Sequence, residues 1–189
     1  LREMSKKERN MIDLLVPINI ELPSNEYIIL KENLDILTNL GFETEEISLA
    51  DGFTLESVEH YPYDEIWETV WGEERWIADH HNTMVVHLKH ASGIAMDMEF
   101  RAFADGFAFR YIFPEQEQKE LTITDELTAY RFAQGAEAWS IPWRTEYYEG
   151  LWSKRTICGD SSVITHDTLC SPVTIEFTDG TYGFVHEAA

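Results

Sequence analysis

Hydrophobic and polar residues follow two different periods along this chain. Residues 11–22, MIDLLVPINIEL, form an apolar run typical of a buried strand. Residues 28–40 then place isoleucine and leucine three and four positions apart, which predicts a helix whose apolar face covers an adjacent sheet. Gly41 stands where a helix C-cap belongs, and residues 41–47, GFETEEI, return to extended chain. Residues 1–47 are therefore predicted to form a strand–helix–strand segment.

From about residue 48 the period changes to strict alternation. Residues 94–101 place Ile, Met, Met and Phe at every second position and charged residues between them, the pattern of a half-buried strand. Residues 107–113 place four aromatic rings on one side in the same way. Asp105-Gly106 and Asp179-Gly180 are strong hairpin turns. The pattern predicts a mainly β fold, an antiparallel β-sandwich over residues 48–189.

The charge of the chain narrows its partners. Lysine and arginine number 14 against 35 aspartates and glutamates, which gives a net charge of −21. Such a surface repels phosphate backbones and anionic lipid, and no apolar run reaches the roughly 18 residues of a membrane helix. We therefore expect no nucleic-acid and no membrane partner, while neutral ligands, cations and basic proteins remain open. No signal peptide is visible, and we expect both ends, Leu1 and Ala189, to be cut.

Aromatic residues stand beside acids in three places: residues 68–82 (ETVWGEERWIADHHN), residues 145–152 (TEYYEGLW) and residues 183–189 (GFVHEAA). Such clusters are typical of sugar binding, because aromatic rings cover the apolar faces of sugars while carboxylates accept hydrogen bonds from hydroxyl groups. Core tryptophans beside a solvated acidic rim would give the same pattern. The candidate residues are Trp67, Trp71, Glu73, Glu74, Trp76, Trp152, His186 and Glu187.

Six segments stand in a characteristic order and spacing: DGF (51–53), EIWETVWGEERWIADHHN (65–82), FRAFADGFAFRYIFP (100–114), AWSIP (138–142), YEGLW (148–152) and DGTYGFVHEAA (179–189). Together they resemble the N-terminal domain of glycoside hydrolase family 97. The likeness covers about residue 48 to the end. It implies a galactose-mutarotase-like β-supersandwich, truncated at its start, that packs on a (β/α)8 catalytic barrel.

The same resemblance implies a function. Members are α-glucosidases or α-galactosidases that act on oligosaccharides and hold a calcium ion in the active site. Their sandwich lends one glutamate to the calcium shell; Glu149 of YEGLW matches it best, and Glu146 is the alternative. The catalytic acid and base belong to the barrel, so no catalytic residue is expected in this chain. A periplasmic or secreted location goes with this interpretation.

The candidate residues acquire roles from this resemblance. Trp67, Trp71 and Trp76 would pack in the core or at the barrel interface, or contact sugar directly. Glu73 and Glu74 would fix a turn or meet the barrel, because paired carboxylates hydrolyse glycosides only at defined separations. Near the end of the chain, domain contact is the role expected of the residues His186 and Glu187.

Residues 14–47 resemble something else, the C-terminal regulatory region of the mismatch-repair protein MutL. The stretch IDLLVP lies where some MutL proteins carry a motif for the sliding clamp, but Ile12 replaces its glutamine, so we do not expect clamp binding. The combination predicts a chimera with its junction between Glu45 and Asp51. A cytoplasmic location goes with the MutL interpretation.

Three hypotheses follow: an accessory domain of a calcium-dependent α-glycosidase, a stand-alone carbohydrate-binding module, and a MutL-like assembly module. A zinc site at the histidines is not expected, because His87 and His90 would face opposite sides of a strand. Arg110 is expected to pair with Glu99 or Glu126 across the sheet. The two cysteines, Cys158 and Cys170, are either bonded to each other or free.

Overall fold

The computed structural model describes residues 37–117, 120–143, 149–156 and 168–187. Within these ranges the chain forms thirteen strands and no helix, and every pairing between them is antiparallel. The predicted mainly β, antiparallel architecture is confirmed. The chain divides into two compact units, unit 1 (Leu1–Tyr130) and unit 2 (Arg131–Ala189). In the ranges given, no helix is long and apolar enough to cross a membrane.

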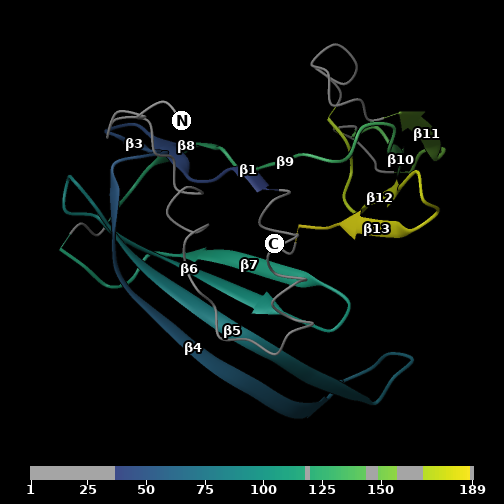
Figure 1. Ribbon diagram of the computed structural model, residues 1–189, viewed down its shortest axis with the longest axis horizontal. Helices are drawn as coiled ribbons and strands as arrows, with labels where there is room; N and C mark the ends of the chain where they lie inside the picture. Colours follow the sequence, from purple (N-terminus) through teal and green to yellow (C-terminus); the bar gives the residue numbers. More distant parts are fainter. Residues whose placement is uncertain (1–36, 118–119, 144–148, 157–167, 188–189) are drawn as a thin grey trace. The chain divides into compact units, whose positions relative to one another are not determined.

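Unit 1 is built on a four-stranded sheet of consecutive hairpins. Its order is β4 (Phe53–Glu68), β5 (Trp76–His90), β6 (Ala95–Ala102) and β7 (Phe107–Ile112), as Figure 1 shows. Residues 91–93 turn β5 into β6, and the predicted Asp105-Gly106 turn joins β6 to β7.

One face of this sheet carries the main core, and it confirms the alternation predicted from the sequence. Alternate residues of β6, among them Met96, Met98 and Phe100, are fully buried, and those of β5 join them from the neighbouring strand. The aromatic rings of β7 pack against the same cluster. The buried members are Leu40, Phe42, Leu49, Phe53, Met84, Val86, Leu88, Ile94, Met96, Met98, Phe100 and Ala102.

Two small sheets complete unit 1. One pairs β1 (Leu37–Asn39) with β9 (Ala129–Tyr130). The other has the order β3 (Ser48–Leu49), β2 (Phe42–Thr44) and β8 (Ile123–Glu126).

The end of the predicted helix is wrong, because residues 37–39 form a strand. Leu37 pairs with Tyr130, and this long-range ladder overrides the local helical period. Gly41 adopts a φ of 111°, where any Cβ would collide with a neighbouring carbonyl oxygen, and its amide donates to the Tyr111 hydroxyl at 3.1 Å. The glycine therefore connects two strands and caps no helix. The rest of the predicted strand and helix, residues 11–36, lies outside the described residues.

Unit 2 is a smaller four-stranded sheet. Its order is β11 (Ser153–Thr156), β10 (Glu137–Ser140), β12 (Val173–Glu176) and β13 (Tyr182–Val185). The predicted Asp179-Gly180 turn joins β12 to β13, with Gly180 at a φ of 85°. The buried core consists of Ala136, Ala138 and Ile175, with Phe132, Val173 and Phe177 packed against it.

Candidate functional site

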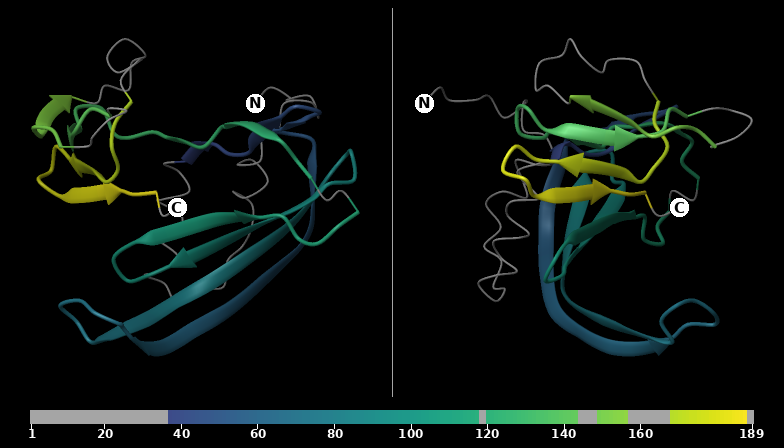
Figure 2. Two further views of the ribbon diagram at one scale, coloured as in Figure 1. Left: turned by 180° about the vertical axis from the view of Figure 1, so that it is seen from behind. Right: turned by 90° about the vertical axis from the view of Figure 1, so that its right-hand side faces the viewer.

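Strands β4 and β5 extend beyond the rest of their sheet as a two-stranded arm, which we define as residues 63–81. Strand β5 pairs with β6 only from Asn82 to Lys89. From His81 to Trp76 its ladder runs to β4 alone among the described residues. Both strands curve away past the ends of β6 and β7 (Figures 1 and 2). A ribbon of two strands is marginally stable by itself, so the arm needs other supports.

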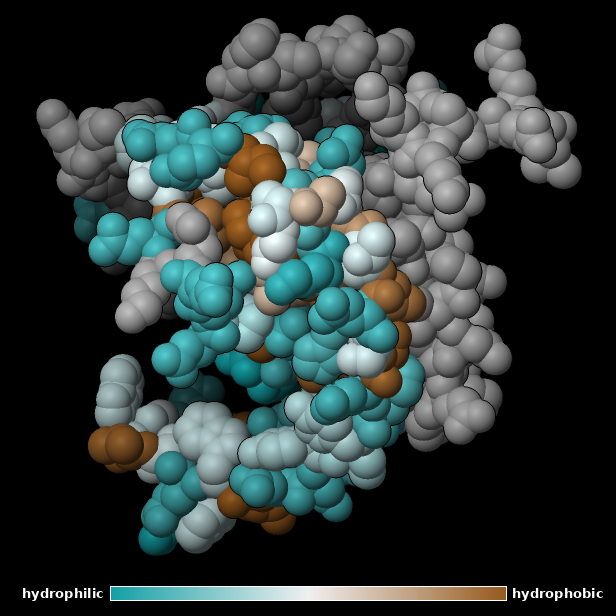
Figure 3. Space-filling model, turned by 90° about the vertical axis from the view of Figure 1, so that its left-hand side faces the viewer, coloured by the Kyte–Doolittle hydropathy of each residue, from teal (hydrophilic) through white to brown (hydrophobic). Residues whose placement is uncertain are grey.

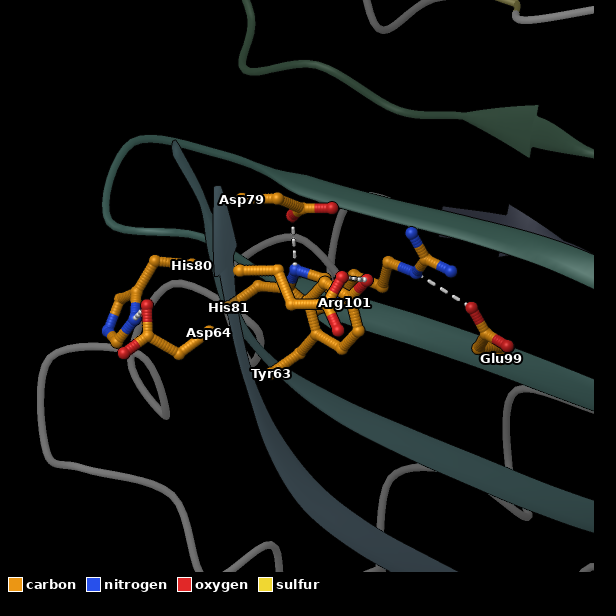
Figure 4. Close-up of polar contacts among 8 residues, drawn as sticks. Tyr63, Asp64, Asp79, His80, His81, Glu99 and Arg101 are labelled. Carbon is orange, nitrogen blue, oxygen red and sulfur yellow. Dashed lines mark hydrogen bonds and ion pairs between the residues drawn. The ribbon is translucent and has the colours of Figure 1, made fainter. Parts of the chain in front are cut away.

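The base of the arm is anchored by His81, which is only 2% exposed. Its ring stacks on Tyr63, its partner across the ladder, and packs against Phe103, each at 4.8 Å between ring centroids. Its Nδ1 lies 2.7 Å from the Oδ1 of Asp79 (Figure 4). The Tyr63 hydroxyl donates to Glu65 at 2.8 Å, and this bond raises the pKa of Tyr63. These contacts fix the direction in which the arm leaves the sheet.

The tip of the arm is closed by polar contacts. Thr69 Oγ1 donates to the carbonyl of Glu74 at 2.6 Å, across the turn. Arg75 Nε lies 2.8 Å from Glu68 Oε1, and the guanidinium lies 5.2 Å from the ring centroid of Trp76. Glu73 and Glu74 are both exposed in this turn. The tip is therefore ordered by its own side chains.

The arm leaves its large apolar side chains in solvent. Trp67, Trp71 and Trp76 are 50%, 88% and 56% exposed, and Val70 is 99% exposed. Among the residues that the structure describes, these side chains therefore do not pack in a core. The other two interpretations, contact with another domain and contact with sugar, remain.

The face of the β4–β7 sheet that lies opposite the core carries a charged cluster. The sequence predicted only one pair of this cluster. The predicted partner of Arg110 is confirmed as Glu99: Arg110 Nη2 lies 2.9 Å from it, and Arg101 Nε lies 2.7 Å from its other oxygen. Burial alone would raise the pKa of Glu99, which is 6% exposed, but the two arginines outweigh burial and lower it. Because both of its oxygens are engaged, this carboxylate is a structural anion.

The histidines do not converge. His87 Nδ1 lies 2.9 Å from Asp97 Oδ1, whereas His90 packs on Phe53 with its Nδ1 2.8 Å from Ser92 Oγ. Throughout the part of the chain that the structure describes, no group of three or more His, Cys, Asp or Glu side chains is placed to hold a metal ion.

The remaining candidates lie in unit 2, and those that the structure describes are exposed. Glu149 and Trp152 both precede β11, and Trp152 is 52% exposed. His186 Nδ1 lies 3.0 Å from Ser171 Oγ, and Glu187 follows it. The alternative calcium ligand, Glu146, and one cysteine, Cys158, lie outside the described residues. Calcium takes six to eight oxygen ligands, so the single carboxylate of Glu149 fits the role of one donor among several.

Sequence reasoning missed an ordered group on the outer face of the unit 2 sheet. Lys154 Nζ pairs with Glu137 and lies 3.0 Å from Glu176 Oε2, and it stands 5.5 Å from the ring centroid of Trp139. Trp139 Nε1 donates to Glu176 at 3.1 Å. The sequence signal for this group was the alternation in EAWS (137–140) and TYGFV (181–185), which places polar and aromatic residues on one side of each strand.

Fold and surface together define a mainly β domain that exposes aromatic rings beside carboxylates. The family model for the Glycosyl-hydrolase 97 N-terminal domain matches residues 14–189, and the chain belongs to this family. The predicted resemblance is confirmed, and with it the β-sandwich class of the fold.

Solved structures agree with this assignment. A glycoside hydrolase family 97 enzyme from Pseudoalteromonas sp. strain K8, in complex with acarbose, is 29% identical with a TM-score of 0.69, over 82% of this chain and 24% of that one. The same enzyme with panose gives 28%, a TM-score of 0.65, and 78% and 23% coverage. A β-arabinopyranosidase at 20% identity and a TM-score of 0.66, over 77% of this chain and 24% of that one, shares the fold. The chain thus spans about a quarter of the length of these enzymes.

The family match also bears on the start of the chain. It begins at residue 14 and runs without a break through the predicted junction between Glu45 and Asp51. The resemblance of residues 14–47 to MutL therefore has no support, and neither does a chimera.

Proposed function

We propose that this chain is an accessory domain of a family 97 α-glycosidase, an α-glucosidase or α-galactosidase, and that it packs against a (β/α)8 catalytic barrel. The family match supports the assignment, and the matched enzymes are about four times as long as the region that they share with this chain. The observation that carries the proposal is the arm, which is anchored at its base, closed at its tip and exposed along its tryptophans.

The arm has the properties of a docking element. Its supports, the packing of His81 and the Glu68–Arg75 pair, hold it in one conformation before it meets a partner. Trp71, at 88% exposure, then offers the largest apolar gain on burial, at about 25 cal/mol per Å². Pre-ordered aromatic anchors of this kind dominate binding energy at protein interfaces. The acids of the tip, Glu73 and Glu74, would lie at the rim of the contact.

Calcium enters the proposal through Glu149. Its exposed carboxylate stands at the edge of unit 2, where it would supply one oxygen donor to a calcium ion whose other ligands come from the catalytic part. The ion would polarise the glycosidic oxygen or orient the sugar. In the calcium site, the role of this chain is limited to holding the ion through Glu149.

The test uses a family 97 glycosidase that carries this chain at its N-terminus. Trp71→Ala together with Trp76→Ala should lower α-glucoside or α-galactoside hydrolysis about tenfold or more, because the arm no longer seats the barrel. Glu149→Gln should instead raise the calcium concentration needed for half-maximal activity. Full activity in the double tryptophan variant would contradict the docking role.

The isolated chain offers a second readout. An unpaired aromatic arm is an exposed apolar surface, so we expect self-association that Trp71→Ala reduces in light scattering. On the face drawn in Figure 3, residues on the hydrophilic side of the hydropathy scale cover most of the described surface. A monodisperse monomer at high concentration would count against an unpaired docking arm.

The same exposed tryptophans favour one alternative, a stand-alone carbohydrate-binding module. Calorimetric titration of the isolated chain with maltose and with galactose, each with and without calcium, separates the two functions. Saturable binding that Trp71→Ala abolishes would favour the module, because the arm would then hold sugar directly.

A further inference from the structure

The outer face of the unit 2 sheet presents a row of side chains across three strands. Trp139 of β10 stands opposite Thr174 of β12, which stands opposite Phe184 of β13. Residues directly opposite each other in an antiparallel ladder project from the same face. The neighbouring rung on this face runs from Glu176 to Tyr182. Together, these two rungs place three aromatic rings and several polar groups on one surface.

The polar part of this face is held in place by its own contacts. Hydrogen bonds from Lys154 and Trp139 lower the pKa of Glu176, and a bond from Tyr182 acts in the same direction. The two carboxylates beside Lys154, those of Glu137 and Glu176, raise the pKa of that ammonium group. Each member of the network is therefore committed to a neighbour. The hydrogen bond from its Nε1 to Glu176 orients the ring of Trp139.

The edge of this face is different, because its apolar atoms are not covered. Phe184 is 73% exposed and Tyr182 is 63% exposed, two residues apart on β13. Between them and β12 lies a shallow concavity of about 280 Å³. Its lining consists of Pro172, Thr174, Tyr182, Gly183, Phe184 and His186. This volume lies just below the range of ligand pockets, which starts at about 300 Å³, so it suits one ring of a ligand and not a whole oligosaccharide.

The chemistry of this concavity selects the ligand. Exposed aromatic side chains favour a partner with a flat apolar side, while Thr174 and His186, which also line the concavity, carry a hydroxyl and an imidazole that can bond hydroxyl groups. Phosphate and carboxylate ligands are disfavoured by the net charge of −21 and by Glu176 close by. A neutral pyranose meets both conditions, since one side of its ring is apolar and its edge carries hydroxyls.

We propose that the concavity beside Tyr182 and Phe184 is a subsite for one neutral pyranose unit of an oligosaccharide, stacked on Phe184. The choice of sugar as the ligand rests on the proposed function, whereas the position of the subsite does not involve the arm. The domain would then hold an oligosaccharide end through unit 2 while the arm of unit 1 serves docking.

The experiment titrates the whole chain with maltose and with panose, followed by calorimetry and by the chemical shifts of β12 and β13 amides. Phe184→Ala should weaken binding by about tenfold or more, since the stacking surface is lost. Phe184→Tyr keeps the ring and should bind within about twofold of the unmodified chain. Because Phe184 is mostly exposed, neither change should alter the thermal unfolding midpoint appreciably.

The matched control is Trp71→Ala, which removes an exposed aromatic ring from the other unit. It should leave saccharide affinity within about twofold. Loss of binding in this variant, with Phe184→Ala unaffected, would overturn the subsite and leave the carbohydrate function standing. Absence of saturable binding to either sugar would also overturn the subsite, while the docking proposal would still be judged by hydrolysis in the complete enzyme.

Discussion

Among the residues that the structure describes, units 1 and 2 are both built from antiparallel strands, yet they bury very different amounts of apolar surface. Unit 1 has a cluster of twelve buried residues, including the fully buried Phe100 and Met98. Unit 2 has a cluster of three, two of them alanines, around Ile175. Hydrophobic stabilisation grows with buried apolar area, so unit 1 should hold its fold by burial, whereas unit 2 depends more on surface contacts and on whatever covers its exposed rings.

The largest expected effect is in the core of unit 1. Phe100→Ala removes a ring that is 0% exposed and stacks with Phe107 and Phe109, so it should cost about 3–5 kcal/mol of unfolding free energy. Urea unfolding followed by circular dichroism measures it. Trp71→Ala is the matched aromatic control, expected within about 0.5 kcal/mol, and a similar cost for both variants would contradict the assigned core.

A smaller effect is expected from the equivalent change in unit 2. Ile175→Ala should cost about 2 kcal/mol, at the low end for such truncations, because the described part of unit 2 surrounds it with two alanines and three partly buried neighbours. Hydrogen exchange separates the units: amides of β10 and β12 should exchange faster, while those of β5 and β6 keep their protection. Uniform loss of protection across both sheets would show that the two units unfold together.

The charged face of unit 1 should contribute less than its core. Glu99→Gln removes the anion that Arg101 and Arg110 share, and it should cost roughly 1–2 kcal/mol at neutral pH, since both arginines keep access to water. Because the pKa of Glu99 is lowered in the fold, its contribution is present above the unfolded pKa near 4.5 and is lost as pH falls through the lower folded value.

The measurement for Glu99 compares unfolding free energies at pH 7 and below pH 4. The difference in unfolding free energy between the unmodified chain and Glu99→Gln should become smaller on acidification. Glu56→Gln, a change at an exposed position of β4, is the control and should show little effect at either pH. A gap that stays constant with pH would mean that the carboxylate does not act as an anion.

The contrast between local and distant strand pairing explains what the sequence could predict. Alternation in residues 94–101 and the two Asp-Gly turns correctly identified strands whose one face is buried by nearby chain. Residues 37–39 were mistaken for the end of a helix, because their strand depends on Tyr130, far along the chain. Local period records which side of an element is apolar. It does not record which distant segment pairs with it.

The candidate site shows the same limit. Aromatic residues beside acids were recognised from composition alone, but whether Trp71 lies in a core or in solvent depends on how far β4 and β5 outrun β6. Glu99 looked like one of the outward charges of its strand, and it is buried because two arginines from the same face close over it. Exposure is a property of the register between strands, which appears only in the folded sheet.

The smallest expected effect concerns the surface network of unit 2. Lys154→Gln removes the cation between Glu137 and Glu176 and leaves two carboxylates facing each other across adjacent strands. The loss of unfolding free energy should be slight at physiological ionic strength, because exposed ion pairs are screened, and it should grow as salt is lowered.

The fluorescence of Trp139 reports the loss of this network directly, since Lys154 stands over its ring and Glu176 accepts a hydrogen bond from its Nε1. We therefore expect an emission shift in Lys154→Gln that added salt diminishes, whereas Lys154→Arg should retain the native spectrum. An emission spectrum of Lys154→Gln identical to that of the unmodified chain at every ionic strength would show that the network does not order this face.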